Sequence, residues 1–133
     1  MTSSDDVLGF GWELHYEDGN SNKFYRLIVV ADGESSIALG LHGARGGTGQ
    51  IGLRKDGITA VAALAEVVKR TREKEKKGYE PSREFTTFLL PASIARTRDG
   101  GKDAHEIARH FGRSARQKGS DLPNASVIPG SDF

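Results

Sequence analysis

The sequence predicts an α+β fold, in which an antiparallel sheet of four to five strands packs on one long α-helix. Short segments in the first half alternate large apolar and polar side chains, and turn residues separate them. Val61, Leu64, Ala65 and Val68 then recur at three- and four-residue spacing, as on a helix with one buried face. After Pro91 the apolar content falls, which predicts a polar C-terminal tail.

Four strands are expected before the helix and one after it. The second is rich in aromatic and β-branched residues, which indicates burial on at least one face. Asp32-Gly33 predicts a tight hairpin turn after it, because this pair tolerates positive φ. The expected strands cover residues 12–16, 24–31, 37–41, 50–55 and 85–90.

The helix has start and stop signals of its own. Thr59 is the expected N-cap, since its hydroxyl can accept a hydrogen bond from a free backbone N–H of the first turn. Lys69 to Lys77 is almost wholly charged, and Lys76 and Lys77 suit the negative end of the helix dipole. Gly78 is the expected residue after the cap.

The predicted domain covers residues 10–90. Residues 1–9 are expected to be a flexible N-terminus, and residues 91–133 a basic and polar extension that is largely disordered. Within this extension Asp103 to Phe111 has the pattern of a short helix. The spacing of Ala108 and Gly112 resembles a helix-turn-helix core only weakly.

Composition excludes several classes of function. The 133 residues include 19 basic and 18 acidic side chains, so a nucleic-acid partner would need a local basic patch. Cysteine is absent, which excludes disulfides and thiolate chemistry. No signal-peptide pattern opens the chain, and the longest apolar run, Leu27 to Ala31, is too short to cross a bilayer. We therefore expect a cytoplasmic protein with no membrane partner.

Two segments carry candidate binding residues. Asn20 to Arg26 reads first as a turn and a strand, which leaves Lys23 free to meet solvent or phosphate. Gly43 to Gln50 is glycine-dense, so its backbone N–H groups could form an anion-binding nest to which Arg45 adds a charge. No Gly-Lys-Ser/Thr follows, and the loop precedes a strand, so neither a Walker A loop nor a Rossmann fingerprint fits. A flexible hairpin connection is the alternative.

These two segments, followed by the charged helix that ends in Lys76-Lys77-Gly78-Tyr79, resemble the WGR domain over about residues 10–90. WGR domains occur in DNA-damage-sensing poly(ADP-ribose) polymerases and in bacterial proteins. In the polymerases an asparagine contacts the broken strand, and Asn22 has that place here. The signature tryptophan stacks on a sugar at a strand end, and the signature arginine contacts a neighbouring domain.

This chain departs from the signature, because His42-Gly43-Ala44 stands where Trp-Gly-Arg would be. A strand that carries a basic DNA contact in the polymerases offers the neutral Thr87 here. The resemblance implies a stand-alone, bacterial-type module that binds nucleic acid, with DNA favoured over RNA, and that has no catalytic activity. The alternative is a protein–protein interaction adaptor that has lost the DNA-contacting residues.

The sequence thus predicts phosphate contacts from a defined set of residues. No catalytic group, metal ligand set, cofactor or small-molecule substrate is expected, because the four histidines lack metal-ligand spacing and no nucleophile–base pair is recognisable. The candidate nucleic-acid-binding residues are Asn22, Lys23, His42, Gly43, Arg45, Gln50, Arg54 and Lys55.

Overall fold

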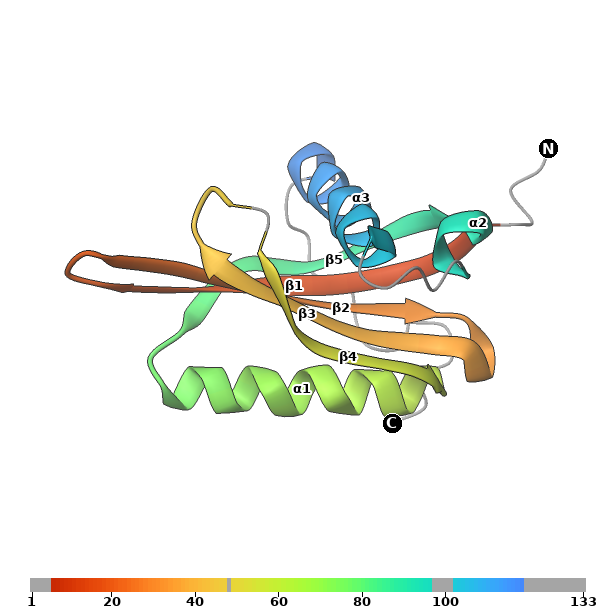
Figure 1. Ribbon diagram of the computed structural model, residues 1–133, viewed down its shortest axis with the longest axis horizontal. Helices are drawn as coiled ribbons and strands as arrows, with labels where there is room; N and C mark the ends of the chain where they lie inside the picture. Colours follow the sequence, from red (N-terminus) through yellow and green to blue (C-terminus); the bar gives the residue numbers. More distant parts are fainter. Residues whose placement is uncertain (1–5, 48, 97–101, 119–133) are drawn as a thin grey trace.

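The computed structural model describes residues 6–47, 49–96 and 102–118. Its fold is α+β, as predicted, with a five-stranded antiparallel sheet in the order β4-β3-β2-β1-β5 (Figure 1). A short 3-10 turn, Gly33–Ser35, joins β2 to β3. The elements are β1 (Asp6–Asp18), β2 (Ser21–Ala31), β3 (Ser36–Ala44), β4 (Gln50–Ile58), α1 (Ala60–Lys76), β5 (Glu80–Pro91), α2 (Ala92–Ala95) and α3 (Lys102–Lys118).

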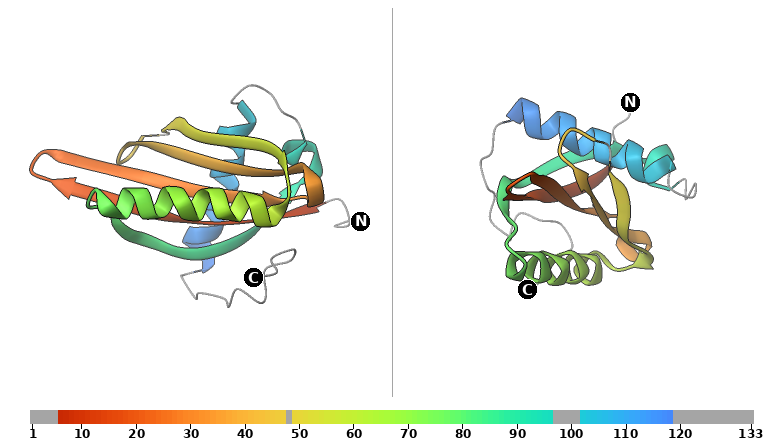
Figure 2. Two further views of the ribbon diagram at one scale, coloured as in Figure 1. Left: turned by 90° about the horizontal axis from the view of Figure 1, so that it is seen from below. Right: turned by 60° about the vertical axis from the view of Figure 1, so that its left-hand side comes forward.

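The described part of the chain holds two long helices where the sequence predicted one, and they cover opposite faces of the sheet (Figure 2). Each helix closes a separate hydrophobic core, so the central strands are apolar on both sides. The α1 core contains Phe10, Leu14, Tyr25, Leu27, Val29, Ala38, Leu53, Ala63, Leu64 and Val67. The α3 core contains Val7, Ile28, Val30, Ile37, Leu39, Leu41, Phe88, Leu90, Ala95, Ala104, Ile107, Ala108 and Phe111.

The C-terminal extension is therefore not largely disordered over its described residues. Helix α3 buries Ile107 and Phe111 completely, and the Phe111 ring meets Phe88 edge to face with centroids 6.0 Å apart. The helix continues without a turn through Gly112, which removes the helix-turn-helix reading. The prediction failed because it weighed the low apolar content of the segment without asking what covers the second face of the sheet. Residues 97–101 and 119–133 lie outside the described residues.

The N-terminal boundary also moves. Strand β1 begins at Asp6 and pairs with the end of β5, where Asp6 lies opposite Pro91. Val7 is buried in the α3 core. Residues 6–9, which were predicted to be flexible, are thus part of the sheet, while residues 1–5 lie outside the described part of the chain.

Helix α1 begins and ends where its signals predicted. The Thr59 hydroxyl accepts a hydrogen bond from the Ala62 N–H at 3.1 Å, and Gly78 has φ +102° directly after the Lys77 cap. The predicted apolar stripe is right for Leu64, which is buried, and for Val68, which packs against the core, but wrong for Val61 and Ala65, which are exposed. The buried positions are Ala63, Leu64 and Val67.

The β2–β3 turn differs from the predicted two-residue hairpin. The Ser36 hydroxyl stabilises this turn, because it accepts a hydrogen bond from the Asp32 N–H at 2.8 Å and donates one to the Gly33 carbonyl at 2.7 Å. Gly33 has φ +56°, as the Asp-Gly pair indicated. The Asp32 carboxylate also accepts two bonds from the Arg96 guanidinium, which ties this turn to α2.

Candidate nucleic-acid interface

The two candidate segments lie side by side because β2 and β3 are antiparallel neighbours. This arrangement puts the start of β2 opposite the end of β3, with Lys23 paired to Ala44. The Arg45 N–H donates to the Asn22 carbonyl at 2.9 Å just beyond the last paired residues. The turn after β1 and the turn after β3 therefore form one continuous edge.

An open hollow of about 680 Å³ lies over this edge, and we refer to it as the hollow. Three of the residues that line it, Lys23, Arg45 and Lys74, are cations, and none of the described lining residues is acidic. Among the described residues no carboxylate forms an ion pair with any of these three cations. The lining residues are Asn20, Ser21, Asn22, Lys23, His42, Gly43, Ala44, Arg45, Lys74 and Tyr79.

A β-bulge sets the position of His42 in the wall of the hollow. The β3–β4 register shifts so that Gly40 faces Leu53 and Leu41 faces Ile51, which leaves Gly52 as the extra residue. A Cβ atom on Gly52 would lie 2.6 Å from both the His42 ring and the Tyr25 hydroxyl. The missing side chain lets the His42 imidazole stack on Tyr25, with ring centroids 5.4 Å apart and planes 20° apart.

Arg70 fixes the other end of the Tyr25 ring. Its guanidinium donates to the Tyr25 hydroxyl at 2.7 Å and to the Gly52 carbonyl at 3.0 Å, and it pairs with Glu73 at 3.2 Å. Tyr25 itself is buried, with 2% of its surface exposed. Helix α1 is thus linked through Arg70 and Tyr25 to the imidazole in the wall of the hollow.

Lys74 lies one helical turn after Arg70 and projects over aromatic rings. Its Nζ is 5.2 Å from the centre of the Tyr25 ring and 5.9 Å from that of Tyr79. Burial lowers the pKa of Lys74, and the positive charges of Lys77 and Arg70 lower it further, while the negative charge of Glu73 opposes them in part. Burial raises the pKa of the Tyr79 hydroxyl. The ammonium group is therefore held at a partly desolvated, cationic position where an anion would stabilise it.

The family model of the WGR domain matches residues 12–86, which is more than half of the chain. The chain belongs to the WGR domain family. This membership suggests nucleic-acid binding in general. Neither the curated proteins nor the solved structures contain a match to the chain.

The WGR match covers the hollow but only part of the fold. It includes every residue that lines the hollow, and it stops at Thr86 within β5. Helices α2 and α3 therefore lie outside the matched segment, although α3 supplies half of the covering of the sheet. The matched segment includes His42-Gly43-Ala44, which is expected from the sequence at the place of the WGR signature.

The structure brings together most of the residues predicted for the WGR site. Asn22, Lys23, His42, Gly43 and Arg45 all line the hollow. The sixth predicted residue, Gln50, is exposed and pairs with His42 across β3 and β4, so it lies beside the hollow without lining it.

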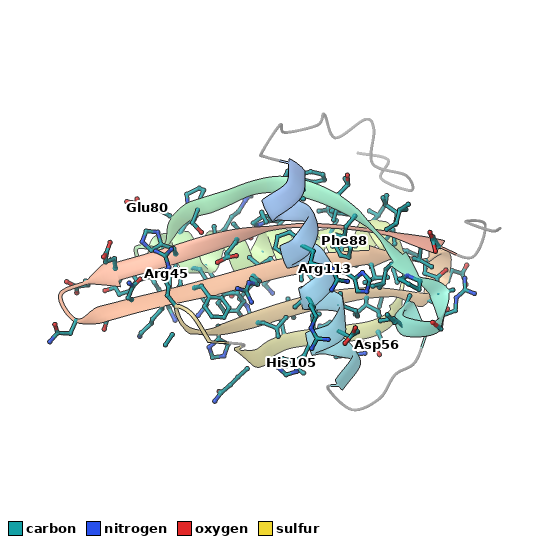
Figure 3. All side chains as sticks on the ribbon, turned by 90° about the horizontal axis from the view of Figure 1, so that it is seen from above. Arg45, Asp56, Glu80, Phe88, His105 and Arg113 are labelled. Atoms are coloured by element: carbon teal, nitrogen blue, oxygen red, sulfur yellow. The ribbon has the colours of Figure 1, made fainter. Side chains whose placement is uncertain are left out.

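Arg54 and Lys55 do not join this group. Both lie farther along β4, where Arg54 pairs with Asp56 at 2.9 Å and Lys55 pairs with Glu66 at 3.4 Å. Figure 3 shows Asp56 and Arg45 well apart along the sheet. The prediction placed both cations by closeness in sequence, but an extended strand carries each residue about 3.3 Å farther from the loop.

The glycine loop does not offer all its amides to a ligand. The Arg45 N–H is bonded to Asn22, and the Gly47 N–H donates to the Ala44 carbonyl at 3.1 Å. Gly46 and Gly49 have φ of +90° and +91°. The glycines therefore shape a tight turn, and the predicted nest of successive free N–H groups is wrong at these two amides. Thr48 lies outside the described residues.

Sequence reasoning missed Lys74 and Tyr79 as site residues, although it considered the charged stretch that contains them. The signal was helical spacing, because Val67 and Lys74 are seven residues apart and so share a face of α1. The predicted stripe ended at Val68, and the charged turns after it were expected either to project into solvent or to lie along the sheet edge, so Lys74 was not included in the site.

Neither a metal-ligand cluster nor a membrane-spanning helix is present among the described residues. No three His, Asp or Glu side chains in residues 6–47, 49–96 and 102–118 gather as a metal-ligand group. The same part of the chain contains no helix with the length and apolar character that spanning a membrane requires.

Proposed function

We propose that this WGR domain binds nucleic acid, DNA in preference to RNA, through the hollow and without catalysis. One observation carries the proposal: β2, the β3–β4 turn and α1 bring Lys23, Arg45 and Lys74 to one concave surface whose described lining contains no carboxylate. Cations that are not held in an ion pair can exchange solvent ions for backbone phosphates, which is the main source of affinity for nucleic acid.

The neutral lining residues have complementary chemistry. Asn22 can donate to phosphate or sugar oxygens, and its place agrees with the asparagine that contacts the strand in the polymerases. His42 offers an imidazole face, which supports stacking on a sugar or base, and Tyr79 adds a second aromatic surface. Gln50 lies beside His42 and can extend the polar contacts.

The binding should be weak and strongly dependent on salt. Each phosphate that a lysine or arginine neutralises contributes a slope of about −0.9 in a plot of log K against log salt, so three cations predict roughly −3. An imidazole is a smaller platform than an indole, and stacking contributes about 1–3 kcal/mol per base. Little preference for base sequence is expected, since these contacts do not read base edges.

Fluorescence anisotropy with a labelled nicked duplex and the same duplex sealed tests the proposal. The Lys23→Gln/Lys74→Gln double variant should bind more weakly, with a slope reduced by roughly two. Lys55→Gln is the matched control, because it removes one lysine that is paired with Glu66 outside the hollow. Absence of wild-type binding at low salt, or a double variant that behaves as the control does, would refute the proposal.

A protein-interaction adaptor is the second candidate. It is supported by the residues at the signature, where His42 and Ala44 replace the tryptophan and arginine that the polymerases use. His42→Trp separates the two candidates. A gain in affinity for nicked duplex supports a nucleic-acid surface, whereas an unchanged affinity together with weak wild-type binding supports the adaptor.

A further inference from the structure

We infer that α3 is a positioning element of the nucleic-acid site and that His105 is the residue through which it acts. The inference rests on the proposed function and deepens it. Helix α3 lies on the face of the sheet opposite α1 and outside the segment that matches the family. One of its side chains nevertheless reaches the glycine loop that shapes the hollow.

The contact joins segments that are 56 residues apart in the chain. The His105 Nε2 atom lies 3.1 Å from the Gly49 carbonyl oxygen, in a partly buried position (Figure 3 labels His105). A carbonyl oxygen can only accept, so the ring must donate from Nε2. Both the neutral Nε2–H tautomer and the imidazolium can do so, and the contact therefore does not require a charge.

Gly49 is the residue through which this contact can act on the site. Its φ is +91°, and a Cβ atom there would lie 2.9 Å from the Phe24 ring and 3.2 Å from the His42 carbonyl. A Cβ atom on Gly43 would in turn lie 3.3 Å from the Gly49 Cα. Gly49 is thus packed directly against β2 and against two residues that line the hollow.

Helix α3 is a rigid support for this contact. Ala104, Ile107 and Phe111 are fully buried against the sheet, so the backbone on either side of His105 is anchored. The glycine loop, Gly43 to Gln50, has exposed residues from Arg45 to Gly47, and four of its residues are glycines, whose backbone is less restricted than that of other residues. A hydrogen bond from an anchored helix to an exposed, glycine-rich loop restricts the loop before any ligand arrives.

The consequence is pre-organisation of Gly43 and Arg45. Without the His105 contact the loop should sample more conformations, and binding would then have to order it. The expected loss is about 3- to 10-fold in affinity for nicked duplex. The salt dependence should stay at the wild-type value, because His105 is not among the residues that line the hollow.

Variants at His105 test the inference in two independent measurements. Hydrogen–deuterium exchange of residues 43–50 in the protein alone should be faster in His105→Leu and close to wild type in His105→Gln, whose amide can also donate. Anisotropy on nicked duplex should show the affinity loss only in His105→Leu. His110→Leu is the matched control, because this histidine is on the same helix and contacts Arg113.

Unchanged exchange of the loop in His105→Leu would overturn the inference, whatever the binding result. Faster exchange of the loop in His105→Leu together with wild-type affinity would also overturn it. The order that His105 gives to the loop would then make no difference to binding. Failure of the wild-type protein to bind any duplex would instead refute the proposed function, and the exchange data would still report on the contact between α3 and the loop.

Discussion

Lys74 combines a charge, partial burial and aromatic neighbours at a single position. Burial is the main cause of its lowered pKa, and the nearby cations act in the same direction. A phosphate in the hollow would oppose both effects, because an adjacent negative charge favours the protonated amine. The residue would therefore gain more from a bound phosphate than a fully solvated lysine would.

This environment predicts a pH dependence of binding. Affinity is complete while Lys74 is protonated, and it falls as the pH rises through the lowered pKa of the free protein. In Lys74→Arg the charge persists, because the guanidinium does not deprotonate. Anisotropy between pH 7 and pH 10 should show that wild-type affinity declines at a lower pH than that of the variant. Parallel curves would show that Lys74 does not contact the ligand.

Tyr25 predicts a measurable contribution to stability from one hydroxyl group. Tyr25→Phe removes the acceptor for Arg70 while keeping the ring that stacks on His42. The free energy of unfolding in urea should fall by about 0.5–1.5 kcal/mol. Tyr16→Phe is the control, because its exposed bond to Asp18 is 3.2 Å long, and its loss should change stability by less than about 0.5 kcal/mol. Equal effects of the two changes would contradict the role assigned to Arg70.

At the scale of single elements, the bulge in β4 determines whether His42 can occupy the wall of the hollow. Gly52→Ala would place a methyl group 2.6 Å from the His42 ring and from the Tyr25 hydroxyl, so at least one ring must move. We expect a loss of about 1–3 kcal/mol in unfolding free energy and weaker binding of nicked duplex. Wild-type stability with an unmoved imidazole, measured by urea unfolding and by the NMR shifts of the His42 ring, would show that the bulge is not required.

The packing of helix α3 on the sheet predicts that a substitution outside the family match lowers the stability strongly. Phe111→Ala removes a fully buried ring and should cost about 3–5 kcal/mol in unfolding free energy, by analogy with other core truncations. Val61→Ala on α1 is the control, since that side chain is 38% exposed, and its effect should be much smaller. A small effect of Phe111→Ala would mean that α3 does not cover the sheet in solution.

The elements differ in how far the sequence specifies them. Local chemistry determined the ends of α1, since Thr59 and Gly78 act within one turn of the helix. The buried face of α1 was not recoverable, because alanines and valines from Ala60 to Val68 allow several apolar stripes. The helical spacing of the apolar residues in α3 was visible in the sequence. The burial of α3 depends on Ile28 and Leu39, which lie on the sheet face away from α1, and only the three-dimensional structure shows this packing.

At the scale of the whole molecule, the sheet separates two tasks. Helices α1 and α3 cover opposite faces of the sheet (Figure 2). The α1 face carries the aromatic and cationic lining of the hollow, and the α3 face supplies a core that braces the glycine loop through His105. The sequence predicted Asn22 and His42 as members of one candidate site, and the antiparallel pairing of β2 with β3 brings both to the hollow. It could not predict Lys74, which reaches the hollow only through the packing of α1 on β2 and β3.

The measurement that tests the central claim most directly is an NMR titration of the ¹⁵N-labelled protein with a short nicked duplex at low salt. We predict shift changes concentrated in residues 20–23, 42–47 and 74–79, which surround the hollow, and little change around Arg54 and Lys55. Shift changes confined to the outward side of α3, around Arg109 and Arg113, or none at all, would contradict the claim that the hollow is the nucleic-acid site.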